Sequence, residues 1–134
     1  MSKKEIGAIT FSIFSLLIAI FAYSLYRNYY DKKIIECLNY HDTISDYIHS
    51  REELNDQQYN TIEALFYSKK AKGCLYFMKS DFVWANGNPA GEGYSLINYS
   101  RGNETMISWE CWYEEDGKCN AKEKEFKKLV DRYR

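Results

Sequence analysis

The chain has 134 residues, of which 46% are hydrophobic and 28% charged, with one proline and a net charge of −1. This length suits one small domain, and this composition excludes a disordered or low-complexity chain. The chain lacks the basic excess of a nucleic-acid-binding protein, so we expect no nucleic-acid partner. Its 13 Tyr, 7 Phe and 3 Trp can bury enough area to build a small core.

An uncharged run of 21 residues, Ile6 to Tyr26 (residues 6–26), lies near the N-terminus. As a helix it spans roughly 32 Å, about the thickness of the hydrocarbon core of a membrane. A buried core helix would be shorter and less uniformly apolar, and a cleaved signal peptide, the main alternative, has a shorter apolar region. Tyr23 and Tyr29 are typical of the aromatic belt at a membrane surface. We therefore predict a single-pass membrane anchor over residues 1–33.

The charges flanking this run do not determine its orientation. Residues 1–33 carry five basic and two acidic side chains, a net +3, which leaves −4 for the remainder. Basic residues stand on both sides of the run, so the positive-inside rule is nearly balanced. Four cysteines in so small a domain are typical of an oxidising compartment. We expect the N-terminus in the cytoplasm and residues 34–134 as a small α+β domain in the periplasm or outside the cell.

The N-terminal residues also resemble those of type IV pilins and pseudopilins. Lys3-Lys4-Glu5-Ile6-Gly7 precedes the apolar run AITFSIFSLLIAIF, like a short basic leader that ends in glycine. This resemblance implies a long N-terminal helix, an antiparallel sheet, often a late disulfide, and assembly through the apolar helix. Two positions depart from the family pattern: Ala8 replaces an aromatic residue or methionine, and Ser12 replaces a glutamate.

Two further helical segments are predicted before any strand. Ile34–His49 carries apolar side chains at spacings of three and four, and no helix breaker separates it from the membrane segment. A second helix is predicted from Asn55, where Asn55 and Gln58 form a capping box, to a terminator at Gly73. Its apolar face would consist of Tyr59, Ile62, Leu65 and Phe66.

Aromatic and β-branched runs after Gly73 predict a small antiparallel sheet of three to four strands. The predicted strands are Cys74–Lys79, Phe82–Ala85, Tyr94–Tyr99 and Thr105–Tyr113. Between two of them, the glycine-rich segment 86–93 is interpreted as a flexible connection, because it leads into no helix and lacks the lysine of a phosphate cradle. An amphipathic C-terminal helix capped at Asn120 follows, with a core face of Phe126, Leu129, Val130 and Tyr133. The predicted fold class is therefore α+β.

Four cysteines allow three disulfide pairings, which the sequence alone does not distinguish. We prefer Cys111–Cys119, which closes a short loop, and Cys37–Cys74, which ties the helix after the membrane segment to the first strand. Cys37 and His41 also have the spacing of a metal site or a nucleophile–base pair on one helix face. Both lie on an apolar stripe, so packing and a disulfide explain them equally well. We expect no metal and no cofactor.

The polar motifs of the chain indicate no reaction. Glu110 and the acidic residues that follow it are more typical of a solvated hairpin tip than of a hydrolase's paired carboxylates. Asn98 and Asn103 begin glycosylation sequons, which matter only in a eukaryotic secretory pathway. We therefore expect a protein without catalysis and infer no small-molecule substrate.

The expected function is that of a single-pass, membrane-anchored, extracytoplasmic interaction or accessory module, such as an envelope complex subunit, an inhibitor, or an immunity or exclusion factor. One alternative is a minor pilin-like structural subunit. Another is a small enzyme that uses Cys37 and His41. The candidate contacts with a protein partner are Trp84, Tyr94, Trp112, Tyr113, Glu114, Glu115 and Asp116.

Overall fold

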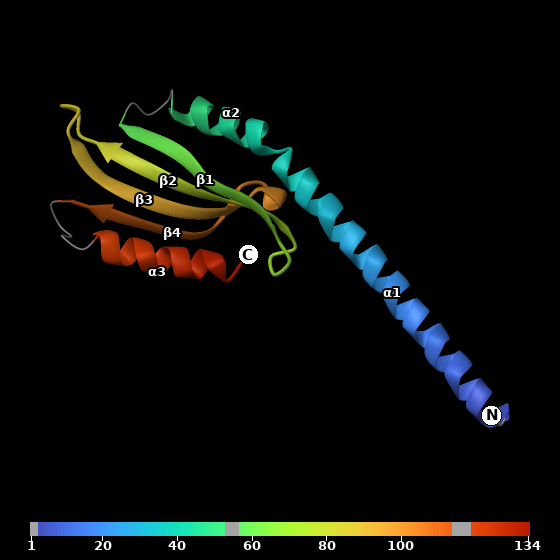
Figure 1. Ribbon diagram of the computed structural model, residues 1–134. Helices are drawn as coiled ribbons and strands as arrows, with labels where there is room; N and C mark the ends of the chain where they lie inside the picture. The colour runs from blue at the N-terminus through green and yellow to red at the C-terminus, as the bar shows by residue number, and fades with distance from the viewer. Residues whose placement is uncertain (1–2, 53–56, 114–118) are drawn as a thin grey trace. The chain divides into compact units, whose positions relative to one another are not determined.

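The computed structural model describes residues 3–52, 57–113 and 119–134 (Figure 1). Its elements in chain order are α1 (Lys3–Leu38), α2 (His41–Glu52), β1 (Gln58–Ser68), β2 (Gly73–Val83), β3 (Pro89–Asn98), the 3₁₀ turn η1 (Tyr99–Arg101), β4 (Glu104–Trp112) and α3 (Cys119–Asp131). The chain divides into two compact units, Met1–Ile35 and Glu36–Arg134. The fold class is α+β, as the sequence predicts.

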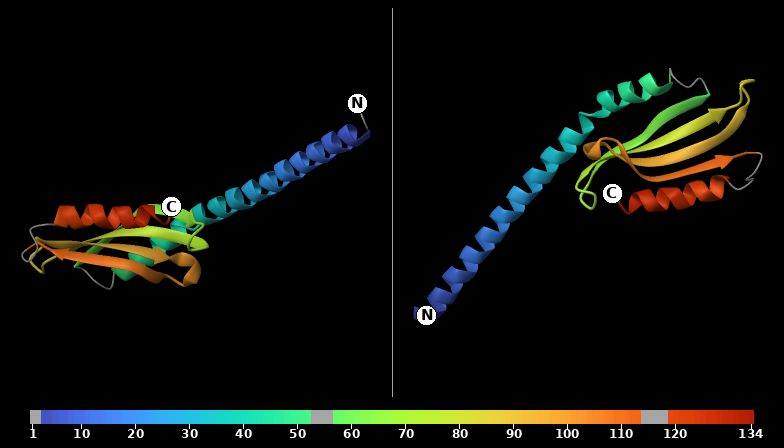
Figure 2. Two further views of the ribbon diagram at one scale, coloured as in Figure 1. Left: turned by 90° about the horizontal axis from the view of Figure 1, so that it is seen from below. Right: turned by 180° about the vertical axis from the view of Figure 1, so that it is seen from behind.

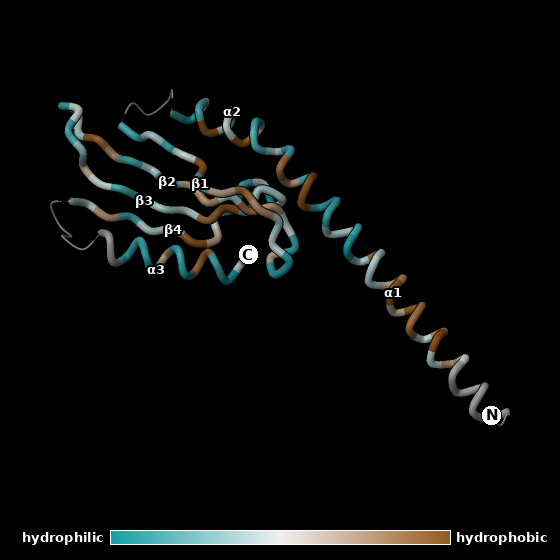
Figure 3. Tube along the Cα trace, in the orientation of Figure 1, coloured by the Kyte–Doolittle hydropathy of each residue, from teal (hydrophilic) through white to brown (hydrophobic). Residues whose placement is uncertain are grey.

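The first unit contains most of the helix α1, whose last three residues belong to the second unit. Its hydrogen bonding continues past Tyr26 without a break, as expected from the absence of a helix breaker. Every side chain from Thr10 to Tyr29 is exposed, although most are apolar (Figure 3). By length and composition α1, taken from Thr10 onward, can cross a membrane, a criterion that an N-terminal signal sequence also meets.

Helical geometry is interrupted at Asn39 and Tyr40, so the segment predicted over Ile34–His49 is divided between α1 and α2. The Tyr40 amide donates to the Cys37 carbonyl at 3.1 Å, which is the three-residue spacing of a 3₁₀ turn. The Tyr40 ring packs on Tyr99 of η1, with 4.7 Å between ring centroids. This contact anchors the start of α2 at one end of the sheet.

The second unit has three layers, with α2 and α3 on opposite faces of one antiparallel sheet (Figure 1 and Figure 2). The strands lie in the order β1-β2-β3-β4, so each pairs with its neighbour in sequence. Successive side chains of a strand point to opposite faces, and β2 therefore contributes to two cores. Leu75 and Phe77 pack on the α3 side, whereas Tyr76 and Met78 pack on the α2 side.

The core on the α3 side is rich in aromatic rings. Phe77 stacks on both Phe126 and Tyr94, with centroid distances of 5.6 Å and 5.7 Å. Tyr94 in turn stacks on Trp109 at 5.6 Å. Phe126 and Val130 of α3 are almost fully buried, which confirms the predicted apolar face of the C-terminal helix. Such ring pairs contribute about 0.5–1.5 kcal/mol each beyond their buried area.

The helix predicted between Asn55 and Gly73 is wrong, because Gln58–Ser68 form strand β1. A β-bulge explains the error. Ile62 pairs with Met78 while Ala64 pairs with Phe77, so one extra residue shifts the alternation of β1. As a result Ile62 and Leu65, three residues apart, both join the core on the α2 side. The bulge thus reproduces in a strand the three-residue spacing of a helix.

The predicted connection 86–93 is also partly wrong, because Pro89–Gly93 belong to β3. β3 pairs with strands on both sides, and its glycines permit this close approach. A Cβ atom on Gly91 would lie 2.3 Å from the Cys111 carbonyl oxygen of β4. The two strands predicted over Cys74–Lys79 and Phe82–Ala85 are likewise one continuous strand, β2.

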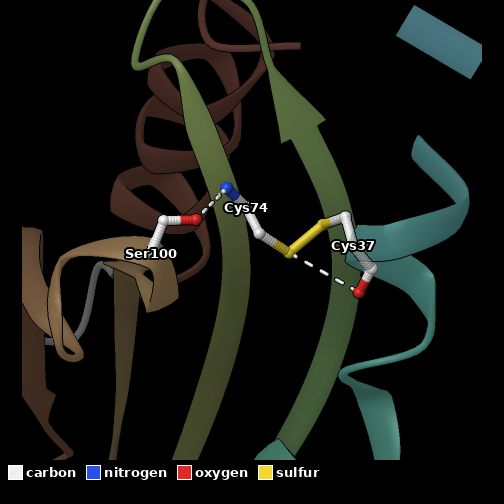
Figure 4. Close-up of a disulfide and its surroundings, with 3 residues drawn as sticks. All are labelled: Cys37, Cys74 and Ser100. Carbon is white, nitrogen blue, oxygen red and sulfur yellow. Dashed lines mark hydrogen bonds between the residues drawn. A yellow bond between two sulfur atoms is a disulfide. The ribbon is translucent and has the colours of Figure 1, made fainter. Parts of the chain in front are cut away.

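Both preferred disulfides are present in the structure. Cys37 bonds to Cys74 with 5.3 Å between Cα atoms, and Cys111 bonds to Cys119 with 5.7 Å. Figure 4 shows the first bond, where Ser100 Oγ also accepts a hydrogen bond from the Cys74 amide at 2.8 Å. Cys111 is buried. Two disulfides are typical of proteins that fold in an oxidising compartment.

We predict that the two disulfides differ in their contribution to stability. The bond between Cys37 and Cys74 spans 37 residues and that between Cys111 and Cys119 spans 8. Each bond lowers the entropy of the unfolded chain, which stabilises the fold by about 4 kcal/mol for the first bond and about 2.6 kcal/mol for the second. Urea unfolding of the two double Cys→Ser variants should show the larger loss for the first pair. A larger loss for the short loop would contradict this explanation.

We predict that Gly91→Ala destabilises the sheet strongly. The added Cβ collides with a backbone oxygen, which cannot move without disturbing the pairing of β3 with β4. The free energy of unfolding should fall by about 1–3 kcal/mol, as for overpacked sites in general. Gly93→Ala is the matched control in the same strand, because its Cβ would meet the Phe82 ring at 3.2 Å and the Trp109 carbonyl oxygen at 3.3 Å, which is a much milder approach. Equal losses in thermal or urea unfolding would refute the role of the close approach.

Candidate functional site

Three aromatic side chains, the half-buried Phe82 and the exposed Trp84 and Trp112, form a group that we call the aromatic platform. The Phe82 and Trp112 rings stack with 5.1 Å between centroids, and Trp84 lies 6.1 Å from Trp112. Trp84 is 42% exposed and Trp112 is 36% exposed. Their edges and faces are therefore available to another molecule.

The pairing of the strands explains why these residues meet. Gly91 of β3 pairs with Phe82 on one side and with Trp112 on the other. Since Gly91 has no side chain, the rings can close over it from the two flanking strands. Alternation along β2 puts Phe82 on the same face as Tyr76. Phe82 lies roughly 20 Å along β2 from Tyr76, beyond the residues that pack under α2.

The structure divides the candidate partner contacts into four groups. Trp84 and Trp112, predicted from separate segments, lie together in the platform. Tyr113 is 47% exposed, and its amide donates to the Ala90 carbonyl at 3.0 Å. Tyr94 is 3% exposed and belongs to the core under α3, not to the surface. The acidic candidates Glu114, Glu115 and Asp116 lie outside the described residues.

Phe82 is not among the contact residues predicted from the sequence. Phe82 lies in a predicted strand, and nothing in its neighbours indicates which aromatic residue of a distant strand it will meet. Only the register between β2, β3 and β4 places it beside Trp112.

A group of charged and phenolic side chains lies on the opposite face of the sheet. Lys79 Nζ is 2.8 Å from Asp81 Oδ1 and 3.7 Å from the buried carboxylate of Glu92. The hydrogen bond from Lys79 to Asp81 raises the pKa of the lysine above its ordinary value. Burial, followed by the charges of Glu92 and Glu123, raises the pKa of Tyr94. This phenol therefore stays neutral.

The start of α3 is attached to this group through Glu123. Lys127 Nζ donates to Glu123 Oε1 at 2.6 Å, and this bond lowers the pKa of the glutamate. The Tyr94 hydroxyl adds a second hydrogen bond to the same carboxylate. These contacts join the first turns of α3 to β3, so we assign the group a structural role.

A pocket of about 510 Å³ lies between α2 and the sheet. Its walls come from α2, from β1 to β3, and from the start of β4. The lining residues are Tyr47, Ile48, Arg51, Glu52, Gln58, Asn60, Tyr76, Met78, Ile97, Asn103 and Thr105. The sequence did not predict this pocket, because its residues come from five separate segments with no motif in common.

The proposed use of Cys37 and His41 in catalysis or metal binding is contradicted. Cys37 is bonded to Cys74, so it carries no thiol that could act as a nucleophile or ligand. The His41 side chain is exposed and lies 3.2 Å from Asp42. Among the described residues, no group of three or more His, Cys, Asp or Glu side chains could hold a metal ion.

Comparisons of this chain with protein-family models, with curated proteins and with solved structures found no match.

We predict that the Glu123 contacts contribute stability that is lost in acid. Because folding lowers the pKa of this carboxyl, its contribution is present above the ordinary value of 4.5 and disappears as the pH falls through the lower folded value. Glu123→Gln should therefore destabilise the domain at neutral pH, and its difference from the wild type should shrink below pH 4.5. Urea unfolding across this range measures the effect. Glu125→Gln, exposed on the same helix, is the control, and a pH-independent loss for Glu123→Gln would contradict the prediction.

Proposed function

We propose that this protein is a membrane-anchored binding module whose disulfide-bonded domain binds a protein partner outside the cytoplasm. The observation that carries the proposal is the aromatic platform, in which Trp84 and Trp112 lie exposed and in ring contact. Trp and Tyr dominate the residues that provide most of the binding energy at protein interfaces. An exposed Trp pair on a sheet is also pre-organised, which reduces the entropy lost on binding.

The anchoring part of the proposal depends on α1. From Thr10 to Tyr29 its side chains are exposed, and the apolar ones would be costly in water. A membrane removes this cost, and the length of the apolar run suits one crossing. Tyr23 and Tyr26 stand where an aromatic belt would meet the membrane surface. We propose that residues 6–26 cross the membrane.

The orientation proposed here has the N-terminus in the cytoplasm and the domain in the periplasm or outside the cell. It is supported by the two disulfides, which thiol-reducing systems of the cytosol would oppose. Four free thiols in protein taken from intact cells, measured by alkylation and mass spectrometry, would contradict this orientation.

The platform is tested by crosslinking the full-length protein in intact membranes and identifying the captured proteins by mass spectrometry. The paired change Trp84→Ala and Trp112→Ala should reduce capture of a specific partner at least about tenfold, the effect expected of a binding hot spot. Tyr59→Ala is the matched control, because Tyr59 is 57% exposed on β1 outside the platform. Equal capture by the wild type and the Trp variant would contradict the proposal.

A second candidate is a pilin-like structural subunit that assembles through its apolar helix. The specific observation in its favour is that α1 runs unbroken from Lys3 to Leu38 with an exposed apolar segment. The mass of the membrane-extracted protein distinguishes the two candidates. Processing after Gly7 would favour the subunit, and a chain that retains Met1 would argue against it.

A further inference from the structure

We infer that the pocket between α2 and the sheet binds a small, neutral, polyhydroxylated ligand of the size of one or two sugar rings. This inference goes beyond the proposed protein partner and does not depend on it, since the pocket and the aromatic platform share no residue. The volume of about 510 Å³ lies within the range of about 300–1,000 Å³ that is usual for small-ligand sites.

One wall of the pocket holds an ordered set of neutral hydrogen-bonding groups. Asn60 Oδ1 accepts hydrogen bonds from Ser80 Oγ at 2.6 Å and from Gln58 Nε2 at 2.8 Å. Gln58 Nε2 also reaches Ser80 Oγ at 3.2 Å. These bonds hold both amides in one orientation before any ligand arrives. Side-chain amides offer donors and acceptors side by side, which matches the vicinal hydroxyl groups of a sugar.

A second polar group lies across the pocket. The Tyr76 hydroxyl donates to Asn103 Oδ1 at 3.3 Å. Burial, followed by the neighbouring Tyr47, raises the pKa of Tyr76 to about 12, so the phenol stays neutral at physiological pH. Asn103 itself has a positive φ of 62°, a backbone conformation that asparagine tolerates better than most residues. Thr105 adds a hydroxyl to the same side.

The charges of the pocket favour a neutral ligand. Arg51 and Glu52 both line it and have opposite signs. The Glu52 carboxylate is already engaged, since it accepts a hydrogen bond from the backbone N–H of Asn60 and lies 2.9 Å from His49 Nδ1. The Arg51 guanidinium lies 5.3 Å from the centre of the Tyr47 ring. A ligand with a net charge would gain attraction from one side chain and repulsion from the other.

The remaining lining groups are apolar, and they suit the carbon skeleton of such a ligand. Ile48, Met78 and Ile97 contribute aliphatic surface, and Tyr47 contributes a ring. The face of an aromatic ring is negative, so it attracts the weakly positive C–H groups on the face of a sugar. A pocket that combines amides, hydroxyls and apolar surface without net charge therefore fits a sugar better than an ion or a wholly apolar molecule.

The methionines allow a test with the unaltered full-length protein in lipid nanodiscs. Met78 lines the pocket, whereas Met106 packs against the core on the other face of the sheet. With ¹³C-labelled methionine methyl groups, millimolar glucose, N-acetylglucosamine or maltose should shift the Met78 signal in a saturable way and leave Met106 in place. Acetate and inorganic phosphate serve as anionic probes. No saturable shift with any of the sugars, or a shift with the anions alone, would overturn the inference.

Two glycine substitutions test whether the side-chain amide of Asn103 takes part in sugar binding. Asn103→Gly removes the amide and leaves a residue that accepts the positive φ. Lys72→Gly is the matched control, because Lys72 has a similar φ of 53° and does not line the pocket. We expect Asn103→Gly to weaken sugar binding about tenfold, as for a lost ligand hydrogen bond, and Lys72→Gly to leave it unchanged. Unchanged binding in Asn103→Gly would contradict the assignment, and so would loss of the Met78 shift in the variant with both Trp84 and Trp112 changed to Ala.

Discussion

The burial of β2 on both faces is the constraint on which the rest of the domain depends. Its odd-numbered residues Leu75 and Phe77 need cover from α3, and its even-numbered residues Tyr76 and Met78 need cover from α2. Neither helix alone could bury this strand. The Cys37–Cys74 disulfide joins the chain just before α2 to the start of the same strand. It therefore holds the α2 layer against the sheet, in a domain too small to rely on a single large core.

The candidate binding surfaces lie at the border of the area that α2 covers on the sheet. α2 packs on the end of the sheet that contains Tyr76 and Ile97, and the pocket lies in the gap beside this contact. The aromatic platform closes over Gly91 towards the far end of β2, beyond the β2 residue Tyr76 that packs in the core under α2. The same face thus carries a polar pocket and an exposed aromatic group. The opposite face, closed by α3, holds its charged groups in contacts within the domain.

Each wrong prediction from the sequence has a particular physical cause. Ile62 and Leu65 have the spacing of a helix because a bulge inserts one residue into β1. The glycines of segment 86–93 indicate a loop by composition, yet Gly91 is needed where β3 approaches the backbone of β4. Tyr94 is of a residue type that is common at protein interfaces, but it faces the core. Its exposure depends on whether α3 covers its side of the strand. In each case the deciding fact is a contact with a segment distant in sequence.

The sequence by itself determined the features that depend on local pattern. These are the apolar helix before Arg27, the closing helix with Phe126 and Val130 on its buried face, and a set of cysteines consistent with two disulfides. Only the tertiary structure decided the register of the strands, and with it the meeting of Trp84 with Trp112 and the pocket under α2. The reason is that periodicity and capping act over a few residues along the chain. Strand register instead depends on pairings between distant segments, which no single segment encodes.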